Sequence, residues 1–71
     1  MRKYAVLFER GEHTWSAYVP DLPGCVAAGD SREETEQLIR EAIAFHIEGL
    51  REEGLPVPEP TTEAGFVPAP L

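Results

Sequence analysis

The side chains best suited to covalent chemistry in this chain are Cys25, His13 and His46. A cysteine nucleophile needs a neighbouring base to form its thiolate, so one histidine would have to be brought to Cys25 by the fold. Cys25 lies between a turn and a short apolar run, however, and His46 lies on the apolar face of a predicted helix. We interpret Cys25 as a buried structural thiol and His13 as a solvated turn residue. His46 is interpreted as a hydrogen-bonded core residue, with a pH-sensitive interface group as the alternative.

Three carboxylates, Glu9, Asp21 and Asp30, are the candidates for a metal site that cleaves phosphodiesters, because a two-metal nuclease needs several converging acids. Each has a simpler local role, at a strand end, in a turn and at a helix cap. The single cysteine excludes an internal disulfide, and no spacing of cysteine and histidine indicates zinc. The sequence therefore predicts no catalytic residue, no metal and no cofactor, with a metal-dependent nuclease as the alternative.

A turn and a helix start follow each other directly and would position these residues. Two prolines restrict the backbone of Pro20–Gly24, which predicts a stiff turn. Gly29-Asp30 ends the short run that follows, and Ser31-Arg32-Glu33-Glu34 has the form of a capping box. In such a box the Ser31 hydroxyl accepts a hydrogen bond from the Glu34 N–H, and the Glu34 carboxylate reaches back. We expect a helix to begin here.

The 71 residues are predicted to form one small α+β domain, residues 1–71. Apolar residues alternate in some segments, as in strands, and recur at helical spacing in another. The predicted elements are strands at about 3–9, 14–19 and 25–28, a helix at about 32–53, and a proline-rich extended tail at 55–71 with a possible strand at 64–67. The expected fold is a three-stranded antiparallel sheet plus a short C-terminal edge strand, with one helix packed on one face (β-β-β-α-β).

The sequence has more large apolar side chains than a core between one helix and one sheet can bury. The apolar arc of the helix is about 200° wide, whereas about 100° covers one sheet. One flank, either Phe45 or Ile47, is therefore a candidate contact between protomers. Alternation places Trp15 and Tyr18 on opposite faces of the second strand, so one of them lies outside the core. With Phe66 of the predicted edge strand, these five residues are our candidate partner or oligomer contacts.

Thirteen acidic and six basic side chains give a formal net charge of −7. This balance argues against direct nucleic-acid binding, which needs a basic surface, and favours a basic protein partner. A solvated acidic helix face is the simpler explanation of the same charges. No apolar stretch approaches twenty residues and no export signal is seen, so we expect no membrane insertion and a cytoplasmic location. So small a core also predicts a homodimer or homotetramer.

The order of these motifs resembles the N-terminal domain of HicB-like antitoxins over nearly the whole chain. The proline turn and capping box are followed by Glu41-Ala42-Ile43, His46 and Glu53-Gly54-Leu55-Pro56-Val57-Pro58. The resemblance implies a fold like a partial ribonuclease H without its catalytic acids. The residues that match the family motif, and that mainly build the fold, are Pro20, Asp21, Leu22, Pro23, Gly24, Cys25, Gly29, Asp30, Ser31 and Glu34.

The resemblance also implies a partner, a small basic HicA-type toxin that cleaves mRNA. Many family members append a DNA-binding module, for which this sequence shows no match, so autorepression is not expected. We therefore predict a non-enzymatic antitoxin that neutralises a HicA-type toxin by protein–protein contact. The alternative is a stand-alone oligomeric orphan module that binds another protein or a small ligand.

Overall fold

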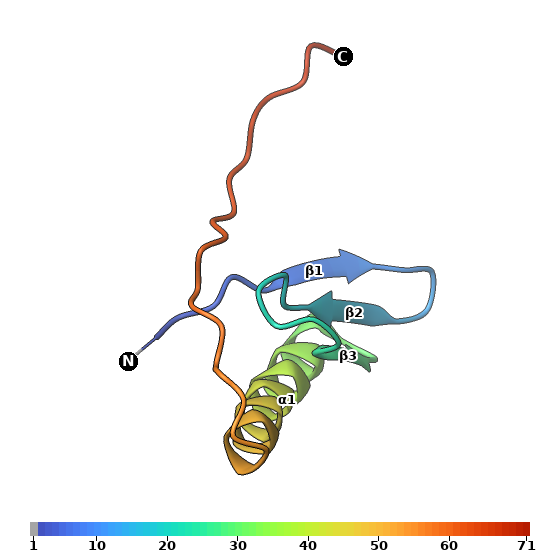
Figure 1. The fold of residues 1–71 in the computed structure, drawn as a ribbon. Coiled ribbons are helices and arrows are strands. Elements are labelled where there is room, and N and C mark those ends of the chain that lie inside the picture. Colours follow the sequence, from blue (N-terminus) through green and yellow to red (C-terminus); the bar gives the residue numbers. More distant parts are fainter. Residues whose placement is uncertain (1) are drawn as a thin grey trace.

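The computed structural model describes residues 2–71, in which a three-stranded antiparallel sheet is followed by one helix (Figure 1). The elements are β1 (Leu7–Arg10), β2 (Trp15–Tyr18), β3 (Val26–Gly29) and α1 (Arg32–Glu52). The strand order is β1-β2-β3, and Ala17 in the central strand is opposite Phe8 on one side and Ala27 on the other. The α+β class and the order of these four elements agree with the sequence prediction.

β1 begins later than predicted, at Leu7 instead of residue 3. Leu7 is opposite Tyr18, the last residue of β2, and the chain turns away immediately after it. The Val19 N–H donates to the Cys25 carbonyl at 3.2 Å and so belongs to the turn. Residues 3–6 consequently have no neighbouring strand with which to pair.

The turn between β2 and β3 supplies part of the core. Leu22 is completely buried, and the core cluster also contains Ala17, Val19, Cys25 and Ile39. Two backbone hydrogen bonds of 3.0 Å close the turn, from the Leu22 N–H to the Val19 carbonyl and from the Cys25 N–H to the Leu22 carbonyl. The proline turn therefore does more than reverse the chain, because it inserts a leucine beneath the helix.

A capping box forms at the start of α1, although the Glu34 carboxylate reaches Asp30 instead of the N-cap residue Ser31. The Ser31 hydroxyl accepts a hydrogen bond from the Glu34 N–H at 3.0 Å, and the Glu34 carboxylate accepts one from the Asp30 N–H at 2.6 Å. A Cβ atom on Gly29 would lie 2.8 Å from the hydroxyl oxygen of the buried Thr35. Glycine is therefore needed where β3 meets the helix.

The tail, residues 55–71, is extended, and the strand predicted at 64–67 does not form within the protomer. These residues pair with no strand among residues 2–71, and Phe66 and Val67 are exposed. Hydrogen bonds donated to Asp21 by Thr61 and Thr62 hold the tail at that point, and its last part is directed away from the body (Figure 1). The strand does not form within the protomer because the attachment at Asp21 leads these residues away from their own sheet.

Candidate partner-binding surfaces

The structure places Cys25 in the apolar core. Its side chain is buried, and burial raises the pKa of the thiol above its ordinary value. The thiolate is therefore disfavoured at neutral pH. His13 is exposed in the hairpin turn, and His46 is half-buried on α1. Cys25 packs with apolar residues, as expected for a structural thiol.

The three carboxylates proposed as an alternative metal set do not form one. Within residues 2–71, no group of three or more His, Cys, Asp or Glu side chains is placed to hold a metal ion. Glu9 and Asp30 are both exposed. Asp21 is used differently, as an anchor for the tail.

Asp21 connects the proline turn to the tail across forty residues of sequence. Its carboxylate accepts hydrogen bonds from the backbone N–H groups of Thr61 at 2.9 Å and Thr62 at 2.8 Å. Both threonine hydroxyls also donate to it, at 3.2 and 2.7 Å. These bonds lower the pKa of Asp21, the largest cause being the bond from the Thr62 backbone. The sequence assigned Asp21 only to the turn; the paired threonines within the proline-rich tail were the available signal.

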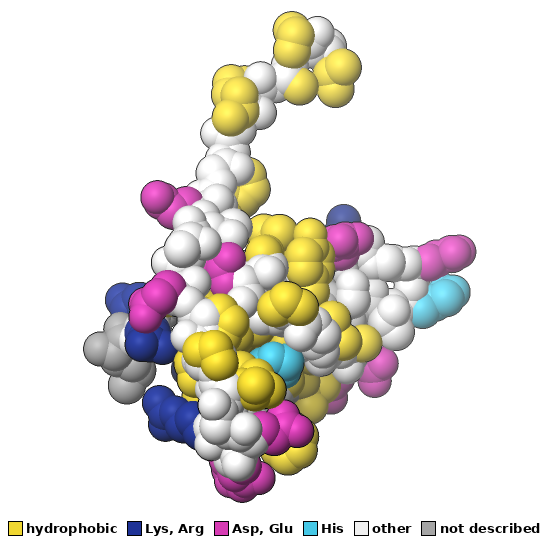
Figure 2. Space-filling view, viewed as in Figure 1, with side chains coloured by type: hydrophobic (Ala, Val, Ile, Leu, Met, Phe, Trp, Pro, Cys, Tyr) yellow, Lys and Arg dark blue, Asp and Glu magenta, His cyan; other side chains and the backbone are white. Residues whose placement is uncertain are grey.

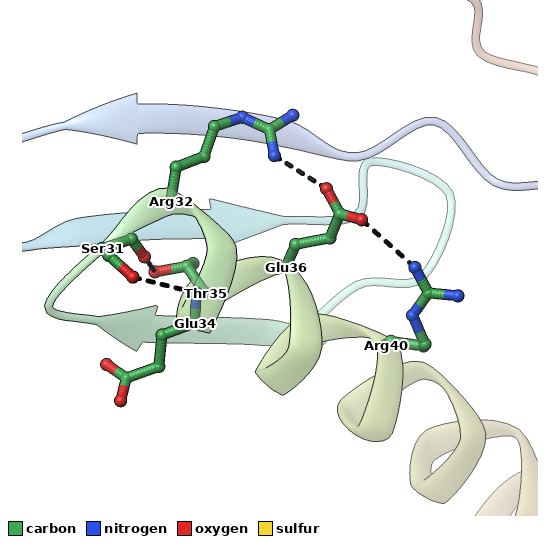
Figure 3. Close-up of polar contacts among 6 residues, drawn as sticks. All are labelled: Ser31, Arg32, Glu34, Thr35, Glu36 and Arg40. Atoms are coloured by element: carbon green, nitrogen blue, oxygen red, sulfur yellow. Dashed lines mark hydrogen bonds and ion pairs between the residues drawn. The ribbon is translucent and has the colours of Figure 1, made fainter.

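On one side of the start of α1 the charged side chains are paired with one another, one glutamate with two arginines (Figure 3). Glu36 pairs with Arg32 at 2.7 Å and with Arg40 at 3.1 Å. The hydrogen bond from Arg32 is the largest cause of the lowered pKa of Glu36. Arg32 also lies 3.8 Å from the centre of the Phe8 ring. The charges on this side of the helix are therefore already engaged with one another.

The outer side of α1 is different, because it carries three acidic and two apolar side chains. Residues three and four apart share one side of a helix. At this spacing lie the exposed residues that we call the acidic helix face: Leu38, Glu41, Phe45, Glu48 and Glu52. Phe45 is 79% exposed. Among the described residues, these three glutamates form no salt bridge, and Glu41 accepts a hydrogen bond from the neutral Gln37 amide.

The structure shows which residue of each predicted pair, Phe45 or Ile47 on α1 and Trp15 or Tyr18 on β2, is more exposed. Ile47 packs against the core, whereas Phe45 does not, so Phe45 is the available contact on α1. On β2, Trp15 is half-buried on the face shared with Ala17 and lies beneath Arg10. Tyr18 is on the other face and is 40% exposed. Phe66 is fully exposed in the tail, beyond the attachment at Thr62.

A groove beside β1 is a surface that the sequence did not predict. α1 packs against β3 and β2, so the face of β1 turned toward the helix is left partly uncovered. The groove has a volume of about 240 Å³. We call it the β1 groove, and its lining residues are Val6, Phe8, Glu36, Ile39, Arg40 and Ile43. Four of the six side chains are apolar, which suits an apolar occupant.

Comparison of the chain with known proteins shows the family to which it belongs. The family model described as "HicB_like antitoxin of bacterial toxin-antitoxin system" matches residues 4–70. The chain belongs to the HicB-like antitoxin family. Antitoxin HicB 2 of Photorhabdus laumondii subsp. laumondii is 32% identical over 69 residues, which are 96% of this chain and 50% of that protein. An uncharacterised 14.9 kDa protein in the rep-hol intergenic region of Haemophilus phage HP1 is 39% identical over 56 residues, which are 79% and 42%.

This HicB-like chain therefore spans about half the length of these two curated relatives. A chain in the solved structure titled "HicA3 and HicB3 toxin-antitoxin complex" has a similar fold, with a TM-score of 0.72 and 33% identity. The similarity covers 84% of the HicB-like chain and 70% of that chain. The family resemblance seen in the motifs is confirmed. No helix within residues 2–71 is both long and apolar enough to span a membrane.

Proposed function

We propose that this HicB-like chain binds and neutralises a small, basic HicA-type toxin that cleaves mRNA. The observation that carries the proposal is the acidic helix face, in which three glutamates share one side of α1 with an exposed phenylalanine. Membership of an antitoxin family and the likeness to a chain of a toxin–antitoxin complex support it. The protein would act by contact, without a catalytic step of its own, and in the cytoplasm where mRNA is cleaved.

The residues of the acidic helix face have different roles in this proposal. Complementary charge mainly increases the rate of association, and the effect decreases as salt is added. Glu41, Glu48 and Glu52 would therefore attract the basic toxin. A large aromatic side chain buried at the centre of an interface contributes most to its lifetime. Phe45 would thus govern dissociation.

Binding kinetics with a HicA-type toxin from the same genome test this assignment. We expect Phe45→Ala to increase the dissociation rate about 10- to 100-fold, equivalent to about 1.4–2.8 kcal/mol. Glu48→Lys should lower the association rate and weaken its dependence on salt. Each variant should also leave more of the toxin's RNA cleavage uninhibited.

Glu12→Lys is the matched control, because it makes the same charge change at an exposed position in the hairpin turn. It should bind the toxin as the unchanged protein does, apart from a small effect of net charge. Equal losses for Glu12→Lys and Glu48→Lys would contradict the role of the acidic helix face. Failure of every basic ribonuclease from the host to bind the chain would instead favour the orphan module.

A further inference from the structure

The last nine residues, which we call the arm (residues 63–71), project beyond the attachment of the tail to Asp21. The hydrogen bonds between Asp21 and Thr61 and Thr62 fix the base of the arm. Beyond that point Phe66 is 102% exposed and Val67 is 88% exposed. Hydrophobic side chains gather on the body near the base of the arm and again along it (Figure 2). The arm therefore displays apolar side chains that nothing in its own protomer covers.

The protomer exposes more surface than a compact chain of its mass. A monomer of 7.9 kDa is expected to expose about 4,400 Å². This chain exposes 5705 Å², an excess of about 1,300 Å². Its radius of gyration is 13.7 Å, whereas about 11 Å is expected for this length. A standard interface buries about 800 Å² on each partner, so the excess is sufficient for a stable dimer.

The prolines of the tail give it one edge that can pair as a strand. They all occupy even-numbered positions: Pro56, Pro58, Pro60, Pro68 and Pro70. Successive residues of an extended strand direct their N–H groups to opposite edges, and proline has none to donate. In the arm, Gly65, Val67 and Ala69 therefore keep their donors on one edge. An edge strand needs donors on one side only.

We propose that the arm of one copy adds to β1 of a second copy as an edge strand, and that the exchange is reciprocal. β1 stands at the edge of the sheet and has a free side. The β1 groove lies beside it, where the inward side chains of an added strand would be placed. Phe66 is the arm residue best suited to fill it. The attachment at Asp21 directs each arm away from its own body and toward the second copy.

This exchange closes a two-fold dimer, because the same arm and the same β1 edge are used by both copies. It also covers an exposed sheet edge, which would otherwise be open to uncontrolled pairing. The acidic helix face takes no part in it. Dimer formation and toxin binding are therefore separate properties that different substitutions should affect.

Sedimentation equilibrium of the full chain tests the exchange with two proline substitutions. Val67→Pro removes a donor from the pairing edge while keeping a side chain of similar size. Ala64→Pro is the matched control, because it places a proline on the edge that already carries them. Both positions are exposed, so the body of the protein should remain folded.

We expect the unchanged protein to be a dimer, and Val67→Pro to raise its dissociation constant at least tenfold. Ala64→Pro should change that constant less than threefold, and Phe45→Ala should leave it unchanged. A monomeric unchanged protein would overturn the proposal, as would equal effects of the two prolines. Loss of toxin binding in Val67→Pro with the dimer intact would also overturn it, by showing that the arm serves the toxin.

Discussion

Leu22→Ala tests whether the proline turn is part of the core. Leu22 is 0% exposed although it lies in a turn. Truncation of a buried leucine to alanine costs about 2–5 kcal/mol, through lost burial and the cavity that remains. A domain of this length has a total stability of about 4–11 kcal/mol. We therefore expect a loss of about 3 kcal/mol and a fall in Tm of about 12–24 °C.

Thermal unfolding followed by circular dichroism of α1 measures this loss. The variants should be compared at equal protein concentration, because self-association raises apparent stability. Phe45→Ala is the control, since it truncates a large apolar side chain that is 79% exposed. It should change stability by less than about 0.5 kcal/mol. A loss below about 1 kcal/mol for Leu22→Ala, or equal losses for both variants, would refute the reasoning.

Three further outcomes are expected. Gly29→Ala should lower stability by about 1–3 kcal/mol in chemical denaturation, because the new methyl group meets the buried Thr35 side chain. The pKa of Asp21 is lowered from 3.8, so its stabilisation of the tail should be complete above that pH and be lost as the pH falls through the lowered pKa. The Thr62 amide resonance should report this release, and Asp21→Asn should show the released signal at neutral pH. Cys25 is buried with a raised pKa, so a thiol reagent should modify it slowly in the folded protein and rapidly in denaturant.

The features that the sequence predicted well are local in the chain. The turn at Pro20–Gly24 and the capping box at Ser31 and Glu34 each depend on residues within a few positions of one another. The tail was harder, because its path depends on hydrogen bonds to Asp21 across forty residues. The edge strand was predicted from its own composition, whereas the attachment at Asp21 determines whether residues 64–67 reach the edge of their own sheet.

The candidate contact residues also depend on tertiary structure that local sequence patterns do not contain. Alternation shows that Trp15 and Tyr18 lie on opposite faces, but only the position of α1 determines which face is covered. Likewise, the helical arc includes both Phe45 and Ile47, and packing against β3 and β2 determines that Ile47 faces the core. The sequence therefore narrows each candidate contact to a pair, and the tertiary arrangement selects one member.

The attachment of the tail has a consequence for the order of folding. The Tyr4 hydroxyl donates to the Pro58 carbonyl at 2.6 Å, a contact between residues 54 positions apart. Closing so long a loop costs more chain entropy than forming the hairpin or the helix. The tail should therefore dock last during folding and detach first under stress. The tail of a HicB-like protomer can accordingly detach from Tyr4 and Asp21 while the sheet and helix stay folded, and the arm would then lose the direction that this attachment gives it.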